Sequence, residues 1–263
     1  MINHISYNNK NVIVHVRDWN KYKMDKKLIF TDLQHTKRFI DSLLVTLEAE
    51  LSTPTENRFN TDRAEIYEIP NFLTDAECDA LVPVIKSNTH KGGVTNKANT
   101  DESYRTAQVH DFEGKPWIQE KIADHMGIHT NFCEPLQGQV YTVGQEFKEH
   151  SDYFERNRPN EYDHYARQQG GQRTWTFMIY LTDVESGGET DFPHLNLVVI
   201  PKKGHALVWN NLYMDGSNNT DTRHRSLPVR AGEKVIITQW FRTHIWEPAR
   251  TPEPEEIEND DCK

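Results

Sequence analysis

Residues 234–242 read KVIITQWFR, and this stretch decides the fold class of the chain. β-Branched and aromatic residues dominate it, so it predicts a β-strand. Alternate side chains of a strand share a face, which here carries Lys234, Ile236, Thr238, Trp240 and Arg242. A lysine at the head of such a face is costly to bury unless an anion pairs with it. Taken alone, Lys234 is also typical of an edge strand, where lysine prevents aggregation. The strand by itself leaves both interpretations open.

Similar strand signals recur through the central part of the chain. They cover residues 139–147, 174–181, 197–200 and 206–209. Glycines separate these segments, as at Gly187-Gly188 and Gly204, and provide the backbone freedom that tight turns require. Short strands with glycine turns and no alternating helices predict a mostly β, antiparallel fold with supporting helices (α+β), namely a barrel or jelly roll.

The chain divides by composition into three predicted parts. Residues 1–65 form an N-terminal extension, in which a strand-like run at 11–16 precedes an apolar period of 3.6 residues over 33–51. That period predicts a helix, which we expect to pack outside the barrel. Residues 66–246 contain the strands and a helix that starts at Thr74, because Thr74 and Glu77 have the spacing of a capping box. Residues 247–263 are acidic and contain prolines, and they predict a solvated, flexible tail.

Composition limits the partners of the protein. The 263 residues carry a formal net charge of −10. This suits a phosphate backbone poorly, so we expect no nucleic-acid partner. Three scattered cysteines are too few for a disulfide framework or a thiolate metal site. The first residues lack the apolar core of a signal peptide, and no run reaches the length of a membrane span. We therefore expect a cytoplasmic protein without a membrane partner, and the sequence leaves its oligomeric state open.

A candidate metal site begins at EHSDYF, residues 149–154. In a strand, His150 and Asp152 share a face, although a His-x-Asp triplet alone is common by chance. His224 lies in another segment, and a jelly roll brings strands that are distant in sequence side by side. Two imidazoles and one carboxylate leave coordination positions open, as in non-haem Fe(II) oxygenases. Zinc hydrolases use similar ligands, so Lys234 is the distinguishing residue: an oxygenase of this type needs a cation for the far carboxylate of a keto acid.

Several motifs, in the same order, resemble the catalytic domain of prolyl 4-hydroxylases. They are GGQRTWTFMIYLTDVESGGETDFP, IPKKGHALVWNN and DTRHRSLPVRAGEKVIITQWFR, preceded by QVYTVGQEFKEHSDYF and, more distantly, by ESYRTAQV and IPNFLTDAECDAL. The resemblance covers about residues 66–244. It implies a double-stranded β-helix (jelly roll) and a dioxygenase that uses Fe(II), 2-oxoglutarate and O2. The implied reaction hydroxylates proline in a peptide or protein substrate and releases succinate and CO2. L-Ascorbate is implied as a further cofactor by the resemblance alone.

The resemblance assigns roles to the residues of the candidate metal site. His150, Asp152 and His224 correspond to the iron ligands of the family. Lys234 corresponds to the lysine that binds the distal carboxylate of 2-oxoglutarate. The physical interpretation of the residues and the resemblance therefore agree on the same four positions.

Four further positions take their roles from the resemblance only. Tyr141 and Thr190 correspond to residues that contact 2-oxoglutarate, although a half-buried strand aromatic and a turn residue are the simpler interpretations. Arg173 and Trp240 correspond to residues that contact the peptide substrate. A surface arginine and a core tryptophan are the alternatives for this second pair.

The sequence departs from the family pattern in places that concern the substrate. Phe147 stands three residues before His150, where the family often has a tyrosine, so the peptide preference is open. Segments 154–172 and 91–103 are long and polar, and each is interpreted either as a lid over the substrate or as a surface insertion. Two other functions stay in consideration: an oxygenase of the same superfamily acting on another residue or a small molecule, and a non-enzymatic jelly-roll binding module.

Overall fold

The computed structural model describes residues 58–93, 103–114, 116–157, 162–167, 169–213 and 215–246, together with three N-terminal strands. These strands, β1 (Ile2–Asn8), β2 (Asn11–Val16) and β3 (Leu28–Phe30), form an antiparallel sheet. β2 coincides with the strand-like run expected at residues 11–16. The helix predicted over 33–51 and the tail at 247–263 lie outside the described residues.

The larger sheet of the described part has β16 (Lys234–Arg242) near its centre. Its order is β4, β13, β9, β16, β7, β6 and β5, with antiparallel neighbours throughout. The other strands are β4 Ile66–Ile69, β5 His90–Lys91, β6 Gln108–Asp111, β7 Gln137–Tyr141, β9 Arg173–Tyr180 and β13 Ala206–Asn210. Because β9 and β7 satisfy the backbone hydrogen bonds on both sides of β16, this strand can be buried along almost its whole length.

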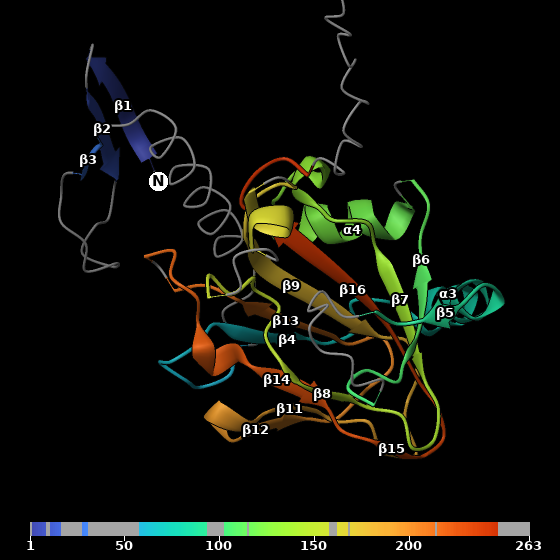
Figure 1. Ribbon diagram of the computed structural model, residues 1–263. Coiled ribbons are helices and arrows are strands. Elements are labelled where there is room, and N and C mark those ends of the chain that lie inside the picture. Colours follow the sequence, from blue (N-terminus) through green and yellow to red (C-terminus); the bar gives the residue numbers. More distant parts are fainter. Residues whose placement is uncertain are drawn as a thin grey trace, which may run out of the picture.

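A second sheet faces the larger one and completes the predicted jelly roll (Figure 1). Its order is β12 (Leu197–Val199), β11 (Thr190–Phe192), β14 (His224–Ser226) and β8 (Phe147–His150). A short ribbon pairs β10 (Ser186–Gly187) with β15 (Val229–Ala231). An apolar cluster lies between the sheets and includes Met178 and Ile236 from the larger sheet and Phe192 and Val199 from the second. The space between the two sheets is therefore a core, except where polar side chains enter it.

The helix predicted at Thr74 is confirmed as α3 (Asp75–Ser87). Thr74 Oγ1 accepts from the Glu77 N–H at 3.2 Å, and the Glu77 carboxylate accepts from the Thr74 N–H at 2.8 Å. This reciprocal pair is the capping box that the sequence predicts. α3 lies on the outer face of the larger sheet, where its buried Leu81 and Ile85 join the core cluster of that face (Figure 1).

A second helix on the same face, α4 (Trp117–Met126), was not predicted. Its buried Ile118, Ile122 and Met126 recur at helical spacing, and Gly127 ends it at a φ of 65°. These side chains pack with α3 against apolar residues of β9 and β16. The two helices therefore support the sheet that carries Lys234. Among the described residues, no helix has the length and apolarity to cross a membrane.

The prediction of one strand over residues 139–147 was wrong. β7 ends at Tyr141, a turn with Gly144 at a φ of 84° follows, and β8 begins at Phe147 in the other sheet. Glycine suits this turn because other residues rarely adopt a positive φ. The turn transfers the chain from one sheet to the other, so Tyr141 and His150 lie on facing walls. Short turns of helix complete the fold at η2 Thr130–Phe132, η3 Tyr162–Arg167, η4 Pro193–Leu195 and η5 Thr220–Thr222.

Candidate active site

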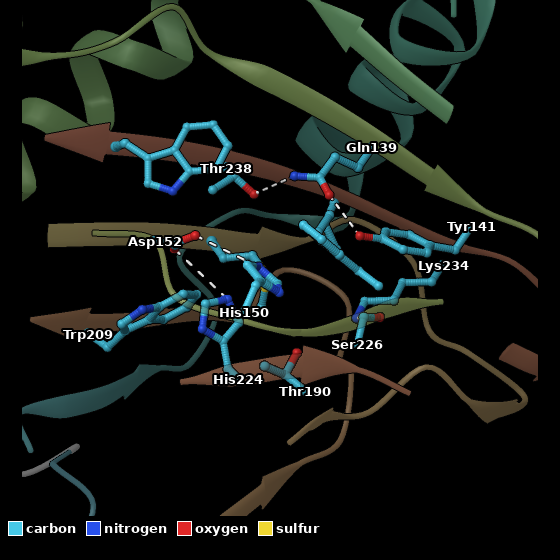
Figure 2. Close-up of a pocket in the computed structure, with 14 residues that line it drawn as sticks. Gln139, Tyr141, His150, Asp152, Thr190, Trp209, His224, Ser226, Lys234 and Thr238 are labelled. Atoms are coloured by element: carbon cyan, nitrogen blue, oxygen red, sulfur yellow. Dashed lines mark hydrogen bonds and ion pairs between the residues drawn. The ribbon is translucent and has the colours of Figure 1, made fainter. Parts of the chain in front are cut away.

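The three predicted metal ligands converge between the two sheets (Figure 2). β8 and β14 are antiparallel neighbours with His150 directly opposite His224, so both imidazoles enter the site from adjacent strands. The Asp152 carboxylate lies 3.8 Å from His150 Nε2 and 3.9 Å from His224 Nε2. One donor atom from each residue lies within 4.8 Å of the others, which is compact enough to hold one metal ion.

Strand alternation, the expected reason for pairing His150 with Asp152, does not apply. β8 ends at His150, and Asp152 lies in a bend beyond it. Thr176 of β9 holds the carboxylate instead, because Thr176 Oγ1 donates to Asp152 Oδ2 at 2.7 Å. The same Oγ1 accepts from Asn211 Nδ2 at 2.8 Å, which fixes the direction of the hydroxyl. The third ligand is therefore oriented from the opposite sheet.

Both histidines present Nε2 to the centre of the site. Nδ1 of His150 lies 2.8 Å from the Lys148 carbonyl oxygen, and Nδ1 of His224 lies 3.0 Å from the Thr222 carbonyl oxygen. A carbonyl only accepts, so Nδ1 carries the proton and Nε2 keeps a lone pair for a metal. Burial and the neighbouring His224 lower the pKa of His150 to about 3, so this imidazole is neutral.

Asp152 supplies the negative charge of the group. Burial raises the pKa of this carboxyl, but the two histidines, Arg173 and the Thr176 hydrogen bond lower it more, and the net shift is downward. The carboxylate is therefore ionised. Two imidazoles, which bind a metal in their neutral form, and one carboxylate form the donor set that binds divalent transition metals.

Lys234 lies at the opposite end of the same pocket (Figure 2). It is 1 % exposed. Its Nζ donates to Ser226 Oγ at 2.8 Å and lies 5.3 Å from the ring centre of Tyr141. Within the described residues no carboxylate forms an ion pair with it, and Glu189 attracts it only at longer range. Burial lowers the pKa of Lys234 to about 7. A buried ammonium without an anion is costly, so this end of the pocket suits an anionic ligand.

Tyr141 and Thr190 also line the pocket. The Tyr141 hydroxyl donates to Gln139 Oε1 at 2.8 Å. Burial raises the pKa of Tyr141 to about 12, so the phenol stays protonated. Thr190 Oγ1 accepts from the Tyr180 hydroxyl at 2.8 Å. Because that bond uses a lone pair of Thr190, its own O–H can still donate to a ligand.

The residues present fit both groups that the resemblance implies. The triad suits Fe(II) with coordination positions left open. The unpaired Lys234 suits one carboxylate of a dicarboxylic keto acid, and one pocket joins the two sites. A zinc hydrolase requires a general base beside the metal-bound water. Apart from the triad, no carboxylate or imidazole of the described chain lines this pocket, whereas Lys234 does, so the pocket itself fits the oxygenase better than a zinc hydrolase.

A wider cleft with a volume of about 790 Å³ opens beside the metal ligands. His150, Asp152, Phe147 and Trp240 line both the pocket and the cleft, so the cleft leads directly to the triad. The cleft is also lined by aromatic side chains: Tyr104, Phe112, Tyr153, Tyr165 and Trp246. Aromatic-lined grooves are typical of sites that bind proline-rich segments.

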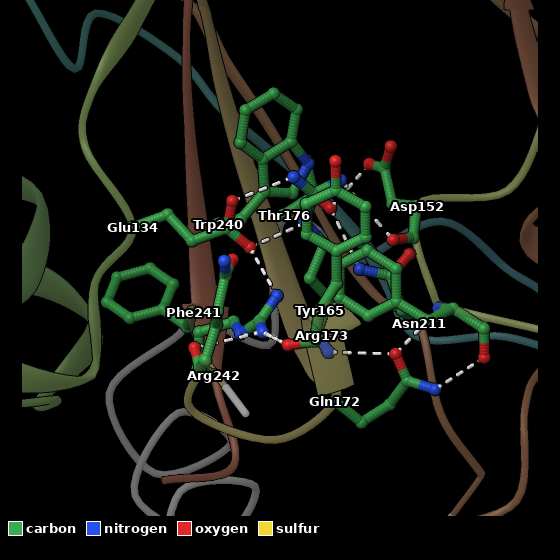
Figure 3. A network of polar contacts seen from close by, with 12 residues as sticks. Glu134, Asp152, Tyr165, Gln172, Arg173, Thr176, Asn211, Trp240, Phe241 and Arg242 are labelled. Carbon is green, nitrogen blue, oxygen red and sulfur yellow. Dashed lines mark hydrogen bonds and ion pairs between the residues drawn. The ribbon is translucent and has the colours of Figure 1, made fainter. Parts of the chain in front are cut away.

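Arg173 belongs to a buried cluster of charges in the wall of this cleft (Figure 3). Its Nε and NH2 donate to the two carboxylate oxygens of Glu134 at 2.6 and 2.7 Å, and its guanidinium carbon lies 4.1 Å from the ring centre of Trp240. Arg242 NH1 donates to the same carboxylate at 2.8 Å. Burial raises the pKa of Glu134, but the two arginines outweigh burial and the net shift is downward. Arg173 and Trp240 both line the cleft, and their contact with a peptide stays a prediction.

Arg242 does not lie on the face predicted for it. A register shift separates Trp240 from Arg242, and Arg242 is absent from the pocket that the four preceding alternate residues line. Its NH2 instead donates to the carbonyl oxygens of Tyr165 and Gln169. These carbonyls belong to segment 154–172, so Arg242 holds this segment against β16. Residues 94–102, most of the other lid candidate, lie outside the described residues. Both lids stay predictions.

Ser226 and Thr176 were missed from the sequence. Ser226 stands two residues after His224 on the same short strand, so alternation alone could have identified it as a residue of the pocket. Thr176 reaches Asp152 only through the pairing of β9 within the larger sheet. No local sequence signal indicates that contact.

Comparison with known proteins identifies relatives over most of the chain. A family model described as "2OG-Fe(II) oxygenase superfamily" matches residues 136–242. Prolyl 4-hydroxylase 5 of Arabidopsis thaliana is 33 % identical over 210 residues, which cover 69 % of each chain. Human prolyl 4-hydroxylase subunit alpha-1 is 28 % identical over 196 residues, which cover 72 % of this chain. The match spans 36 % of the human subunit, so the similarity concerns about a third of that protein.

A solved structure agrees in fold. The viral collagen prolyl hydroxylase of Paramecium Bursaria Chlorella virus-1, in its 2OG complex, matches with a TM-score of 0.52 and 28 % sequence identity. The match covers 67 % of this chain and 95 % of the viral one. Nearly the whole viral structure therefore has a counterpart in this chain.

Proposed function

Since the chain belongs to the prolyl 4-hydroxylase family of 2OG-Fe(II) oxygenases, we propose that it hydroxylates proline in a peptide or protein. Fe(II) is the metal, 2-oxoglutarate and O2 are the cosubstrates, and succinate and CO2 are the products. The relatives are named prolyl 4-hydroxylases, which supports this reaction. The support concerns the part of each relative that the chain matches.

One observation carries the proposal. A fully buried lysine, for which the described part of the chain provides no carboxylate partner, shares a single pocket with the His-Asp-His group. A metal that chelates one end of a keto diacid leaves the other carboxylate pointing away from it. Lys234 is the cation that would receive this carboxylate. A binding module that needs no cosubstrate has no use for such a costly charge.

The chain's own residues bind, orient and cover the reacting groups. His150 and His224 would bind the metal through Nε2, and Asp152 through its carboxylate. Lys234 would hold the distal carboxylate of 2-oxoglutarate, with the hydroxyls of Tyr141 and Thr190 beside it. When bound, the iron and its cosubstrates supply the oxidising chemistry, and the protein supplies orientation and a closed site.

Aromatic rings limit the access of water to the ligands. Phe147 stacks on the His150 imidazole with ring centres 3.6 Å apart and planes 15° apart. The Trp209 ring centre lies 4.7 Å from that of His224. These contacts fix the planes of both imidazoles and surround them with apolar surface.

The cleft supports a peptide rather than a free amino acid as the substrate. Its volume of about 790 Å³ suits an extended segment of several residues. Arg173 and Trp240 stack against each other in its wall, and we propose that this surface contacts the peptide. Phe147 lines the cleft without a hydroxyl, so the peptide preference is expected to differ from that of relatives with a tyrosine there.

A succinate-release assay with mass spectrometry tests the function. Proline-rich peptides are compared with the same peptides carrying alanine for proline, with free proline, and with no substrate. We expect succinate to rise and one oxygen to be added at proline only with the proline-rich peptides. L-Ascorbate, which we include as a cofactor, is expected to prolong turnover. His150→Ala is expected to abolish turnover without changing the fold by circular dichroism.

Other outcomes select the remaining functions. Turnover with free proline or another small molecule alone indicates a different oxygenase of the superfamily. Binding of 2-oxoglutarate without turnover on any substrate favours a binding module. Undiminished turnover in His150→Ala contradicts the metal site.

A further inference from the structure

Asp152 has the least backbone support of the three metal ligands. His150 and His224 lie in paired strands, so the ladder between β8 and β14 fixes their spacing. Asp152 follows the last residue of β8 and takes no part in that ladder. Thr176 orients its carboxylate, but from the larger sheet. Gln172 also pairs with the backbone of Phe154 at 2.6 and 2.7 Å, again from the side of β9. None of these contacts joins the segment after His150 to the strand of His224, so a contact between these two would add separate support.

Arg223 makes this contact. It stands immediately before His224, and its Nε donates to Glu149 Oε1 at 2.9 Å. Its NH1 donates to Glu155 Oε1 at 3.3 Å. Glu149 and Glu155 flank residues 150–152 on either side. The Arg223 guanidinium thus contacts both ends of the segment that carries His150 and Asp152, and Arg223 itself adjoins His224. This is possible because β8 and β14 lie side by side (Figure 1).

The two ion pairs of Arg223 are partly shielded from water. The side chains of Arg223, Glu149 and Glu155 are 26, 36 and 18 % exposed. Burial lowers the pKa of Arg223, but its bonds with Glu149 and Glu155 raise it more. The Arg223 hydrogen bond also lowers the pKa of Glu149. Arg223 and Glu149 are therefore charged at neutral pH, and the rigid fork of the guanidinium fixes the direction of its bonds.

We propose that Arg223 is a positioning residue of the metal centre, which raises metal affinity by fixing the spacing of the three ligands through Glu149 and Glu155. The bonds of Arg223 go to the flanking carboxylates, so its effect passes through them to the ligands. This inference rests on the metal centre of the proposed function, and the test below separates the two.

The sign of the effect distinguishes positioning from simple electrostatics. Arg223 is a cation near a site for a divalent cation, and charge alone would make it repel the metal. Removing the charge in Arg223→Gln would then tighten metal binding. Positioning predicts the reverse, namely weaker binding. Glu149→Gln weakens binding under either account, so Arg223→Gln is the decisive variant.

Mn(II) binding to the full chain, followed by the EPR signal of the free ion, measures this effect without turnover. We expect Arg223→Gln to raise the Mn(II) Kd about tenfold, in the range found when groups behind metal ligands are removed. Arg223→Lys keeps the charge but not the fork, and about a threefold rise is expected. Because Glu149 acts through the same pair, adding Glu149→Gln to Arg223→Gln is expected to raise the Kd by less than the product of the single effects.

Arg225→Gln is the matched control. Arg225 lies two residues further along the same strand and carries the same charge, but its Nε donates to Asp191 of β11 at 2.7 Å. We expect it to change the Mn(II) Kd by less than about twofold, because this pair joins β14 to β11 and not to the segment that carries His150 and Asp152. Thr176→Val, which removes the donor to Asp152, is the positive control and is expected to raise the Kd at least about tenfold. Thermal unfolding of each variant checks the fold.

His150→Ala separates the two proposals. If wild type and His150→Ala bind Mn(II) equally, the metal centre itself is wrong. If His150→Ala loses Mn(II) but Arg223→Gln binds it as tightly as wild type or more tightly, only the positioning role is overturned. An effect of Arg225→Gln equal to that of Arg223→Gln also overturns it. If Arg223→Gln does not fold, Arg223→Lys decides the question: because it keeps the charge, a raised Mn(II) Kd supports positioning and an unchanged Kd overturns it.

Discussion

Two sets of buried cations in the described part of this jelly roll differ in their partners. In the cleft wall, Arg173 and Arg242 share the carboxylate of Glu134 through bonds of 2.6, 2.7 and 2.8 Å (Figure 3). At the inner end of the pocket, Lys234 has the hydroxyl of Ser226 but no carboxylate within ion-pair distance in the described chain (Figure 2). Each set contains a cation shielded from solvent: Arg242 is 0 % and Lys234 is 1 % exposed.

The difference separates a structural charge from a ligand-binding charge. A buried cation that has its own anion contributes to the folded state and needs nothing further. A buried cation that lacks one costs stability in the free protein, and this cost is offset only when an anion arrives. The partner of the Glu134 cluster is part of the chain, whereas the partner of Lys234 is the proposed cosubstrate. Variants at the two sites should therefore affect different measurements.

The largest expected effect is on stability, from Glu134→Gln. This change leaves two buried guanidiniums without a carboxylate, and we expect it to lower the free energy of unfolding by about 3–5 kcal/mol. Urea unfolding measures the loss. The affinity for 2-oxoglutarate should remain within about twofold of wild type, because Lys234 is untouched.

Asp79→Asn is the control for this variant. Asp79 accepts from Lys203 at 2.6 Å, but its side chain is 68 % exposed. The same carboxylate-to-amide change is therefore expected to cost less than about 1 kcal/mol. Equal losses in the two variants would mean that the Glu134 cluster stabilises the fold no more than a surface pair does.

Lys234→Met should have the opposite profile. It removes the cation for the distal carboxylate, and we expect the 2-oxoglutarate Kd, measured by calorimetry with Mn(II), to rise about 100-fold or more. The free energy of unfolding in the absence of ligand should stay the same or increase, because an unpaired buried charge is replaced by an apolar side chain of similar length. A large loss of stability with unchanged affinity would place Lys234 in the same class as the Glu134 cluster.

The sequence predicted the residues of this comparison unevenly. Alternation along β16 correctly placed Lys234, Ile236, Thr238 and Trp240 on the wall of one pocket. It failed for Arg242, because a register shift after Trp240 changes the direction of the strand end. Irregularities of this kind depend on the neighbouring strand, which a single strand's sequence does not describe.

The metal ligands show the same limit. The pattern of residues 150–152 and the resemblance to a family predicted a cluster that the structure brings together, but the strand argument for it was wrong because β8 ends at His150. What holds Asp152 and Lys234 in place is set by sheet pairing: Thr176 on β9 for the first and Ser226 on β14 for the second. Such cross-sheet partners have no local signature, so the sequence predicted the ligands but not their supports.

The pH dependence of ligand binding gives a further test of the unpaired lysine. Burial lowers the pKa of Lys234 from its usual 10.5 to about 7, so above pH 7 the free protein holds a neutral amine. A carboxylate favours the ammonium form, and binding above pH 7 therefore takes up a proton. The 2-oxoglutarate Kd is expected to rise by up to about tenfold per pH unit above 7. Calorimetry in buffers of different ionisation enthalpy measures this proton uptake directly.

The lowered pKa of Lys234 also makes the free energy of unfolding depend on pH. Between pH 7 and 10.5 the unfolded chain binds a proton at Lys234 that the ligand-free folded state does not. The contribution of this residue to stability therefore rises with pH over that window. Lys234→Met should remove this contribution to the pH dependence of the free energy of unfolding. Lys234→Arg, which stays charged, should remove the pH dependence of the 2-oxoglutarate Kd. If the 2-oxoglutarate Kd still rises with pH in Lys234→Arg, another group causes the pH dependence.

The smallest expected effect comes from Ser226→Ala, and its pH dependence shows what the hydroxyl does. Ser226 Oγ accepts from Lys234 Nζ, so it stabilises the ammonium over the amine. Without it, the pKa of Lys234 should fall further, by about half a unit to one unit. At pH 8, where the amine already predominates, this raises the 2-oxoglutarate Kd about three- to tenfold. At pH 6, where most of the lysine is still protonated, the change should be less than about threefold. If Ser226→Ala raises the 2-oxoglutarate Kd equally at both pH values, Ser226 binds the cosubstrate itself. Its hydroxyl then does not stabilise the charged form of Lys234.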